Sequence, residues 1–338
     1  MADVFRTSDG VGLRLVESGP ADAPVTVLFL HGWTSALDVW DHVVAALGPR
    51  VRTLRFDHRG HGSSEPAPAG GATLARLAAD AAEVIAARVP TGGLVLVGHS
   101  MGGMTLMALA EGHPEVAKRA SAVVFVSTSS GRMREVTFGL PRPLVRFATR
   151  RSVRSSSGGS AASGASAASG GGSVRTGGRK RRVRVKLPPP VRRVGSLAVV
   201  RWLVFGTRFR MVDVRATADH AAAVHPKTAA ALGRDIGEHD RATALANFEH
   251  ADVRVLVGEL DRLTPLSHAR AIAEAAPHAE FVLFPGAGHM LPYERVRELA
   301  AHITRAAATV KSAPTSYPQS PEPIHIPDET TPARPTRR

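Results

Sequence analysis

A serine flanked by small residues is the first feature of this sequence that could carry chemistry. Ser100 lies in the segment LVGHSMGGMTL (96–106), with glycine two positions away on either side. The apolar run before the serine predicts a buried strand, and the run after it predicts a helix. A sharp strand-to-helix turn would present the hydroxyl as a nucleophile, and glycine neighbours leave room for such a turn. The alternative is a loop that happens to contain small residues.

A serine hydroxyl attacks poorly until a base takes its proton. His289, in FPGAGHMLPYE, follows the last predicted strand, and the small residues before it leave the ring room to approach Ser100. The chain has 15 histidines, so placement rather than residue type singles this one out. The alternative is a histidine at the start of a helix with no chemical role.

The imidazole in turn needs a carboxylate that fixes its tautomer and stabilises the imidazolium. Asp261 ends the segment LVGELD, just past the preceding predicted strand, and Glu259 is the second candidate. Another possible position for the acid follows VVFVS, but the residues there, TSSGRM, include no carboxylate. That absence favours Asp261.

Acyl transfer also needs two hydrogen-bond donors for the oxyanion. The backbone N–H of Met101 directly follows the nucleophile, and the second predicted donor is the N–H of Trp33 in LHGWTS. Gly32 lets the chain turn there. His31 could be proposed as a base, but it closes a buried strand, so we interpret it as a structural residue that orients this loop.

The elements around these residues alternate between strands and helices, which predicts a doubly wound, mostly parallel sheet. Two short strands joined through Asp9 and Gly10 form a hairpin. Further strands are predicted at 25–30, 51–57, 94–100 and 121–128, and the segments 253–261 and 280–289 are each predicted to be a strand followed by a loop. Helices are predicted at 36–47, 73–89, 101–112, 265–275 and 292–308. Thr73 is the predicted N-cap of its helix.

The alternation breaks in the middle of the chain. Residues 155–173 are Ser, Gly and Ala only, and a basic run closed by three prolines follows. Such a composition cannot fill a core, so we expect a disordered insertion at about 151–194. The proline-rich segment 311–338 is expected to be a disordered tail.

The formal net charge of +14 arises in one segment. Residues 132–193 hold 16 of the 43 Lys and Arg and a single acidic residue, so the rest of the chain is nearly neutral. A basic run can bind nucleic acid or an anionic surface. No aromatic residue is interleaved with the run at 179–193, which argues against nucleic acid and leaves a solvated loop or a weak contact with an anionic surface.

The composition of the chain excludes some kinds of chemistry and indicates where in the cell the protein is expected. The chain contains no cysteine, which excludes disulfides and thiolate chemistry. Its first residues lack the pattern of a secretory signal, and the longest apolar run, 197–205, is too short to span a bilayer and contains Arg201. We therefore expect a cytoplasmic protein.

Taken together, these motifs resemble the α/β-hydrolase superfamily, in particular its serine hydrolases with a GHSMGG elbow. The resemblance covers about 1–128 and 250–308 and includes the HG loop, DHRGHGSS (57–64), the elbow, GELDRLTP and GAGHMLPYE. The order Ser100, Asp261, His289 is that of the family. Its DxRGxGxS loop is structural, which assigns Asp57, Arg59 and His61 to loop packing.

The resemblance implies a fold with an eight-stranded, mostly parallel sheet, helices on both faces and a helical cap. The core would comprise 1–128 and 250–310, and the cap 129–249. The family implies no metal and no organic cofactor. A serine at position 100 sets aside the epoxide hydrolases and dehalogenases of this fold, whose nucleophile is aspartate.

The expected function is cleavage of a carboxylic ester of a small or medium acyl substrate through an acyl-enzyme. The same residues would serve a cofactor-free haloperoxidase or perhydrolase, a lactonase or a carbon–carbon bond hydrolase, and a non-catalytic binding protein is a third hypothesis. Substrate choice would depend on the cap. Its bulky apolar side chains could line a pocket, touch a lipid surface beside Arg201, Arg208 and Arg210, or pack on the domain, and we favour packing; they are Leu197, Val200, Trp202, Leu203, Phe205 and Phe209.

Overall fold

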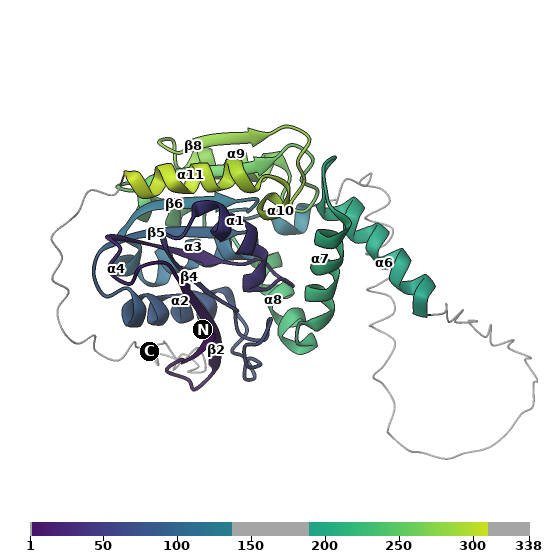
Figure 1. Cartoon of the computed structure of the whole chain (residues 1–338), viewed down its shortest axis with the longest axis horizontal. Helices are drawn as coiled ribbons and strands as arrows, with labels where there is room; N and C mark the ends of the chain where they lie inside the picture. Colours follow the sequence, from purple (N-terminus) through teal and green to yellow (C-terminus); the bar gives the residue numbers. More distant parts are fainter. Residues whose placement is uncertain (1, 137–188, 310–338) are drawn as a thin grey trace, which may run out of the picture.

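The centre of the computed structural model, which describes residues 2–136 and 189–309, is a twisted sheet with strand order β1-β2-β4-β3-β5-β6-β7-β8 (Figure 1). Its strands are β1 Ala2–Arg6, β2 Gly12–Ser18, β3 Val25–Leu30, β4 Arg52–Phe56, β5 Gly93–His99, β6 Ala120–Val126, β7 Asp252–Gly258 and β8 Glu280–Phe284. The pairs β1–β2 and β2–β4 are antiparallel, and the other pairs are parallel. The expected eight-stranded, mostly parallel sheet and its N-terminal hairpin are confirmed.

Two apolar layers cover the two faces of the sheet. On β3, Leu28 and Leu30 face one layer while Val27 and Phe29 face the other, as the alternation of side chains along a strand requires. The first layer contains helices α2 Leu74–Arg88, α3 Met101–Gly112 and α9 Leu266–Ala275, and the second contains α1 Asp41–Leu47 and α11 Val296–Ala308. Burial on both faces explains why the parallel strands are continuous apolar runs.

Helix boundaries follow local chemistry. The hydroxyl of Thr73 accepts the N–H of Arg76, so the predicted N-cap of α2 is confirmed. The helix predicted at 36–47 begins as a 3₁₀ turn, η1 Leu37–Trp40, before α1. The helix predicted at 292–308 is two helices, α10 Leu291–Glu294 and α11, because Arg295 leaves the helical conformation at φ −135° and ψ 44°.

The segment between β6 and β7 is called the cap segment here. Its described elements are η2 Met133–Glu135, α6 Pro189–Val204, α7 Met211–Ala223, α8 Pro226–Glu238 and η3 Ala242–Phe248; the short α4 Pro114–Ala117 precedes β6. Helices α6, α7 and α8 stand at one end of the sheet in Figure 1. The predicted extent of the insertion was wrong at its end, because 189–194 are helical. Proline is tolerated in the first turn of a helix, so the prolines there begin α6 rather than exclude it. Residues 151–188 and 311–338 lie outside the described residues.

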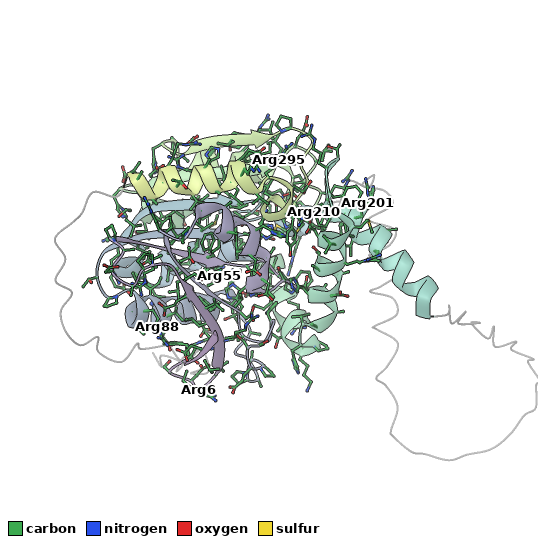
Figure 2. All side chains as sticks on the ribbon, viewed as in Figure 1. Arg6, Arg55, Arg88, Arg201, Arg210 and Arg295 are labelled. Carbon is green, nitrogen blue, oxygen red and sulfur yellow. The ribbon has the colours of Figure 1, made fainter. Side chains whose placement is uncertain are left out.

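Apolar and basic side chains of the cap segment make contacts with each other and with the core. Phe205 is 1% exposed and stacks near Tyr293, with ring centroids 6.4 Å apart. The Arg201 guanidinium lies 4.3 Å from the centre of the Phe209 ring, and Arg210, labelled with Arg201 in Figure 2, donates two 2.8 Å hydrogen bonds to Asp213. These contacts favour packing on the domain. None of the helices in the described ranges is both long and apolar enough to span a membrane.

Candidate active site

Ser100 occupies the turn between β5 and α3. Its backbone lies in a strained region, with φ 53° and ψ −118°. A Cβ on Gly98 would lie 2.6 Å from the backbone of Gly102, and one on Gly102 would lie 2.3 Å from the carbonyl oxygen of Leu30. The two glycines are therefore required by the close approach of β5, α3 and β3, which holds the serine in its strained turn.

Asp261 and His289 follow the carboxyl ends of β7 and β8, two adjacent parallel strands. The Nδ1 of His289 lies 2.9 Å from Oδ2 of Asp261, and both side chains are buried. The other oxygen of Asp261 accepts the N–H groups of Leu263 and Thr264, and the Thr264 hydroxyl donates to Oδ2 at 2.8 Å. Four donors thus surround this carboxylate.

The charge balance of Asp261 follows from these contacts. Burial alone would raise the pKa of its carboxyl group, but His289 and the hydrogen bonds from Thr264 outweigh burial and hold that pKa below its usual value. The carboxylate is therefore ionised at neutral pH and available to stabilise an imidazolium. Since its Oδ2 meets Nδ1, the Nε2 atom of His289 is left for proton transfer, on the assignment that Nδ1 carries the hydrogen.

Glu259, the second candidate for the acid, has another partner. Its Oε2 accepts, at 2.8 Å, the N–H of Gly286 in the loop that leads to His289, and the Glu259 side chain is exposed at the end of β7. The structure brings Asp261, and not Glu259, together with His289.

The loop after β3 lies directly against the elbow. A Cβ on Gly32 would be 3.2 Å from Cβ of Ser100, so Trp33 follows a residue in contact with the serine. Met101 is the first residue of α3. Within the described ranges, neither the Trp33 nor the Met101 N–H donates a hydrogen bond to the protein. Both donors predicted for the oxyanion are therefore next to Ser100 and unengaged.

Three buried histidines, His31, His58 and His61, lie in or beside the loop after β3 and form hydrogen bonds there. The Nδ1–H of His31 donates to the carbonyl oxygen of Gly32 at 2.8 Å, and its Nε2 accepts the N–H of His58 at 2.9 Å. The Nε2 of His61 accepts the N–H of Thr34 at 3.3 Å. Burial lowers the pKa of His31 to about 4 and that of His61 to about 3, so both are neutral at physiological pH. These contacts fit the structural role expected for His31 and His61.

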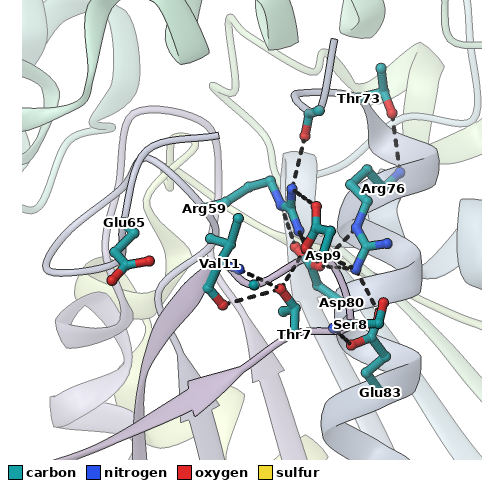
Figure 3. Close-up of polar contacts among 12 residues, drawn as sticks. Thr7, Ser8, Asp9, Val11, Arg59, Glu65, Thr73, Arg76, Asp80 and Glu83 are labelled. Carbon is teal, nitrogen blue, oxygen red and sulfur yellow. Dashed lines mark hydrogen bonds and ion pairs between the residues drawn. The ribbon is translucent and has the colours of Figure 1, made fainter. Parts of the chain in front are cut away.

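The remaining residues of the DHRGHGSS loop also bind neighbouring segments. Arg59 is fully buried and donates to Asp80 of α2 and to Asp9 of the β1–β2 turn (Figure 3). Arg59 holds the pKa of Asp9 well below its usual value. Asp57 accepts the N–H groups of Leu37 and Ser63. This network joins a turn, a loop and a helix, as the packing role assigned to Asp57 and Arg59 requires.

Two residues outside the predicted site, His99 and Thr264, contact its members. The Nε2–H of His99 donates to the carbonyl oxygen of His289 at 3.0 Å, and the two rings are 4.8 Å apart. Burial lowers the pKa of His99 to about 3, so it is neutral. Thr264 holds Asp261, and its position three residues after an aspartate was a local signal for a hydrogen-bonded turn. No local signal reveals the contact between His99 and His289.

In the described part of the chain, no group of three or more His, Asp or Glu side chains is arranged to hold a metal ion. The described residues at this edge of the sheet include a serine in a strained turn, a buried His–Asp pair and two backbone N–H groups that donate to no other described residue.

Comparisons with known proteins agree with this architecture. The model of the alpha/beta hydrolase fold family matches residues 25–147. Over 103 residues the chain is 35% identical to a probable oxidoreductase, EphD, of Mycobacterium tuberculosis, and the match covers 30% of this chain and 17% of that protein. It is 35% identical over 103 residues to a pimeloyl-[acyl-carrier protein] methyl ester esterase of Nitrosomonas europaea, covering 30% and 37% of the two chains. The chain thus matches less than half the length of these curated relatives.

Solved structures extend the likeness to most of the chain. An esterase from Exiguobacterium antarcticum superposes with a TM-score of 0.68 at 15% identity, covering 91% of this chain and 100% of that one. The enol-lactonase from Burkholderia xenovorans gives a TM-score of 0.65 at 21% identity, covering 90% and 100%. At these identities the likeness concerns the fold. The chain has the α/β-hydrolase fold.

Proposed function

We propose that this protein is a serine hydrolase that cleaves a carboxylic ester of a small or medium acyl substrate. The observation that carries the proposal is the 2.9 Å contact between His289 and Asp261 at the edge of the sheet where Ser100 occupies its strained turn. The pair provides a base with an ionised partner, and the turn provides a hydroxyl.

The reaction has two halves. Ser100 Oγ attacks the ester carbonyl while His289 Nε2 takes its proton, and the N–H groups of Trp33 and Met101 bind the oxyanion. His289 then protonates the leaving alcohol, and the acyl group remains on Ser100. Water, deprotonated by His289, attacks the acyl-enzyme and releases the acid, restoring Ser100. Asp261 stabilises the imidazolium in both halves.

Turnover of nitrophenyl esters of graded acyl length tests the proposal and sizes the pocket. Ser100→Ala should lower kcat by a factor on the order of 10⁴–10⁶, since the nucleophile is lost. Ser127→Ala is the matched control, because Ser127 also has a positive φ, of 46°, at a strand end and its hydroxyl has no partner among the described residues. It should retain activity within about twofold.

Three further assays separate the alternatives. A fluorophosphonate should label the wild type and the Ser127→Ala variant but not Ser100→Ala; failure to label the folded wild type contradicts the proposal and favours a binding protein. Peracid formation faster than acid release from one ester would indicate a perhydrolase, and faster turnover of a lactone than of its open-chain ester would indicate a lactonase.

A further inference from the structure

Three glycines bring the loop of His289 into backbone contact with two other segments. A Cβ on Gly258, at the end of β7, would lie 2.1 Å from the carbonyl oxygen of Gly288. A Cβ on Gly288 would lie 2.5 Å from the nitrogen of Gly206, just after α6. No side chain separates these backbones, so the residue before His289 is packed between the core and the cap segment.

The carboxylate of Glu294 joins two of these glycines. Its Oε2 accepts the Gly206 N–H at 2.8 Å, and both of its oxygens lie 3.0 Å from the nitrogen of Gly288. One donor belongs to the cap segment and the other to the residue directly before His289. Glu294 is the last residue of α10, which follows His289 in the sequence, so its side chain reaches back to the residue that precedes His289.

This carboxylate has no cationic partner among the described residues, since none of the ion pairs there includes it. Burial raises the pKa of Glu294, which shows that its charge costs free energy in this position. An apolar side chain would avoid that cost, but it would leave the N–H groups of Gly206 and Gly288 without this acceptor. The two hydrogen bonds therefore serve the geometry of this loop.

The main chain of His289 also makes hydrogen bonds to the cap segment and to His99. Its N–H donates to the carbonyl oxygen of Val204 at 2.8 Å, and its carbonyl oxygen accepts the Nε2–H of His99. Asp261 orients the ring, and these contacts orient the backbone from which the ring projects. Glu294 completes the set by fixing the preceding peptide.

We propose that Glu294 is a positioning residue that holds the His289 backbone against the cap segment, so that the imidazole is aligned with both Ser100 and Asp261. The inference rests on the proposed function, because alignment has a purpose only if His289 transfers a proton. It adds a residue that acts through His289 rather than by touching the substrate.

Two substitutions test the role in the full-length protein. Glu294→Gln keeps the shape but places an amide NH₂ against an N–H donor, and Glu294→Ala removes both acceptor atoms. We expect kcat to fall about tenfold in the first and about a hundredfold in the second, because small displacements of a catalytic group have effects of this size. KM should stay within about twofold, since the substrate pocket is unchanged.

Glu259→Gln is the matched control. Glu259 also accepts a backbone N–H of this loop, but its side chain is exposed and its donor, Gly286, lies two residues further from His289 than Gly288 does. Its kcat should stay within about twofold of the wild type. Thermal unfolding of each variant shows whether a loss of kcat belongs to folded protein.

A second measurement does not depend on turnover. The proton between His289 and Asp261 should give a low-field NMR signal in the wild type and in Ser100→Ala, and Glu294→Ala should shift or broaden it. Wild-type kcat in both Glu294 variants, or equal losses in Glu259→Gln, would overturn the positioning role. If the wild type neither turns over esters nor reacts with a fluorophosphonate, the proposed function fails. The role of Glu294 is then tested by the low-field signal alone. A change of that signal in Glu294→Ala supports the positioning role, and an unchanged signal overturns it.

Discussion

The histidines on the two sides of Ser100 have opposite environments. Beside the loop after β3, His31, His58 and His61 are buried against each other and the backbone, and burial holds the pKa of each below its usual value. At the ends of β7 and β8, His289 is equally buried but lies 2.9 Å from the carboxylate of Asp261.

The difference lies in what each ring contacts. A neutral imidazole can donate one hydrogen bond and accept another, and His31 uses both to fix the turn at Gly32. A base must also become charged, and only His289 of these four has a buried carboxylate hydrogen-bonded to its ring. Histidine therefore has a structural role in the loop after β3 and is a candidate proton acceptor in the loop after β8.

Removing the carboxylate tests the comparison most strongly. Asp261→Asn gives the His289 ring a neutral partner, like the partners of the His31 and His61 rings. We expect kcat on nitrophenyl esters to fall by about 10⁴, because an amide neither stabilises the imidazolium nor fixes the required tautomer. Glu259→Gln is the control and should stay within about twofold of the wild type; an Asp261→Asn loss no larger than this would place the acid elsewhere.

Acid titration tests the other side of the comparison. The folded-state pKa values of His31 and His61, about 4 and about 3, lie below the value of 6.5 for a free histidine. Below pH 6.5 the unfolded chain therefore binds more protons. The free energy of unfolding should fall by about 1.4 kcal/mol per pH unit for each such residue as the pH drops from 6.5 toward 4.

Urea unfolding of wild type and His61→Gln at pH 7, 6 and 5 measures this slope. The variant should be less stable at pH 7 but should lose about 1.4 kcal/mol per unit less between pH 6 and 5. His278→Gln, which changes an exposed histidine, should match the wild type. Parallel curves for wild type and His61→Gln would show that His61 is not held neutral by the fold.

The smallest effect on activity is expected at the contact between the loop after β3 and the cap segment. The indole Nε1–H of Trp33 donates to the carbonyl oxygen of Ala229 in α8 at 3.1 Å, and the ring packs on Gly233. Trp33→Phe keeps the ring but removes the donor, so kcat/KM should fall about threefold to tenfold, the equivalent of one neutral hydrogen bond. Trp202→Phe changes a similarly exposed tryptophan of α6 and should have no effect. Equal values for the two variants would mean that the histidines alone hold the loop.

Local patterns in the sequence were sufficient for most of the core. The buried strands are apolar runs of the expected length, and Thr73 caps α2 through a hydrogen bond to a residue three positions away. Both features depend on near neighbours in the chain. The α6 boundary was missed because composition weighed against 189–194, whereas proline in a first turn is compatible with a helix.

The sequence by itself determined the fold class and which serine and histidine could act together, because these residues follow apolar strands whose carboxyl ends must share one edge of a parallel sheet. It favoured Asp261 over Glu259 as the acid, and the tertiary structure decided between the two, since Asp261 contacts His289 while Glu259 accepts the N–H of Gly286. The tertiary structure also decided that His99 and Glu294 meet the His289 loop and that Trp33 reaches α8. Those contacts join segments up to 196 positions apart in the chain, and close packing of backbones at Gly206, Gly258 and Gly288 brings such segments together.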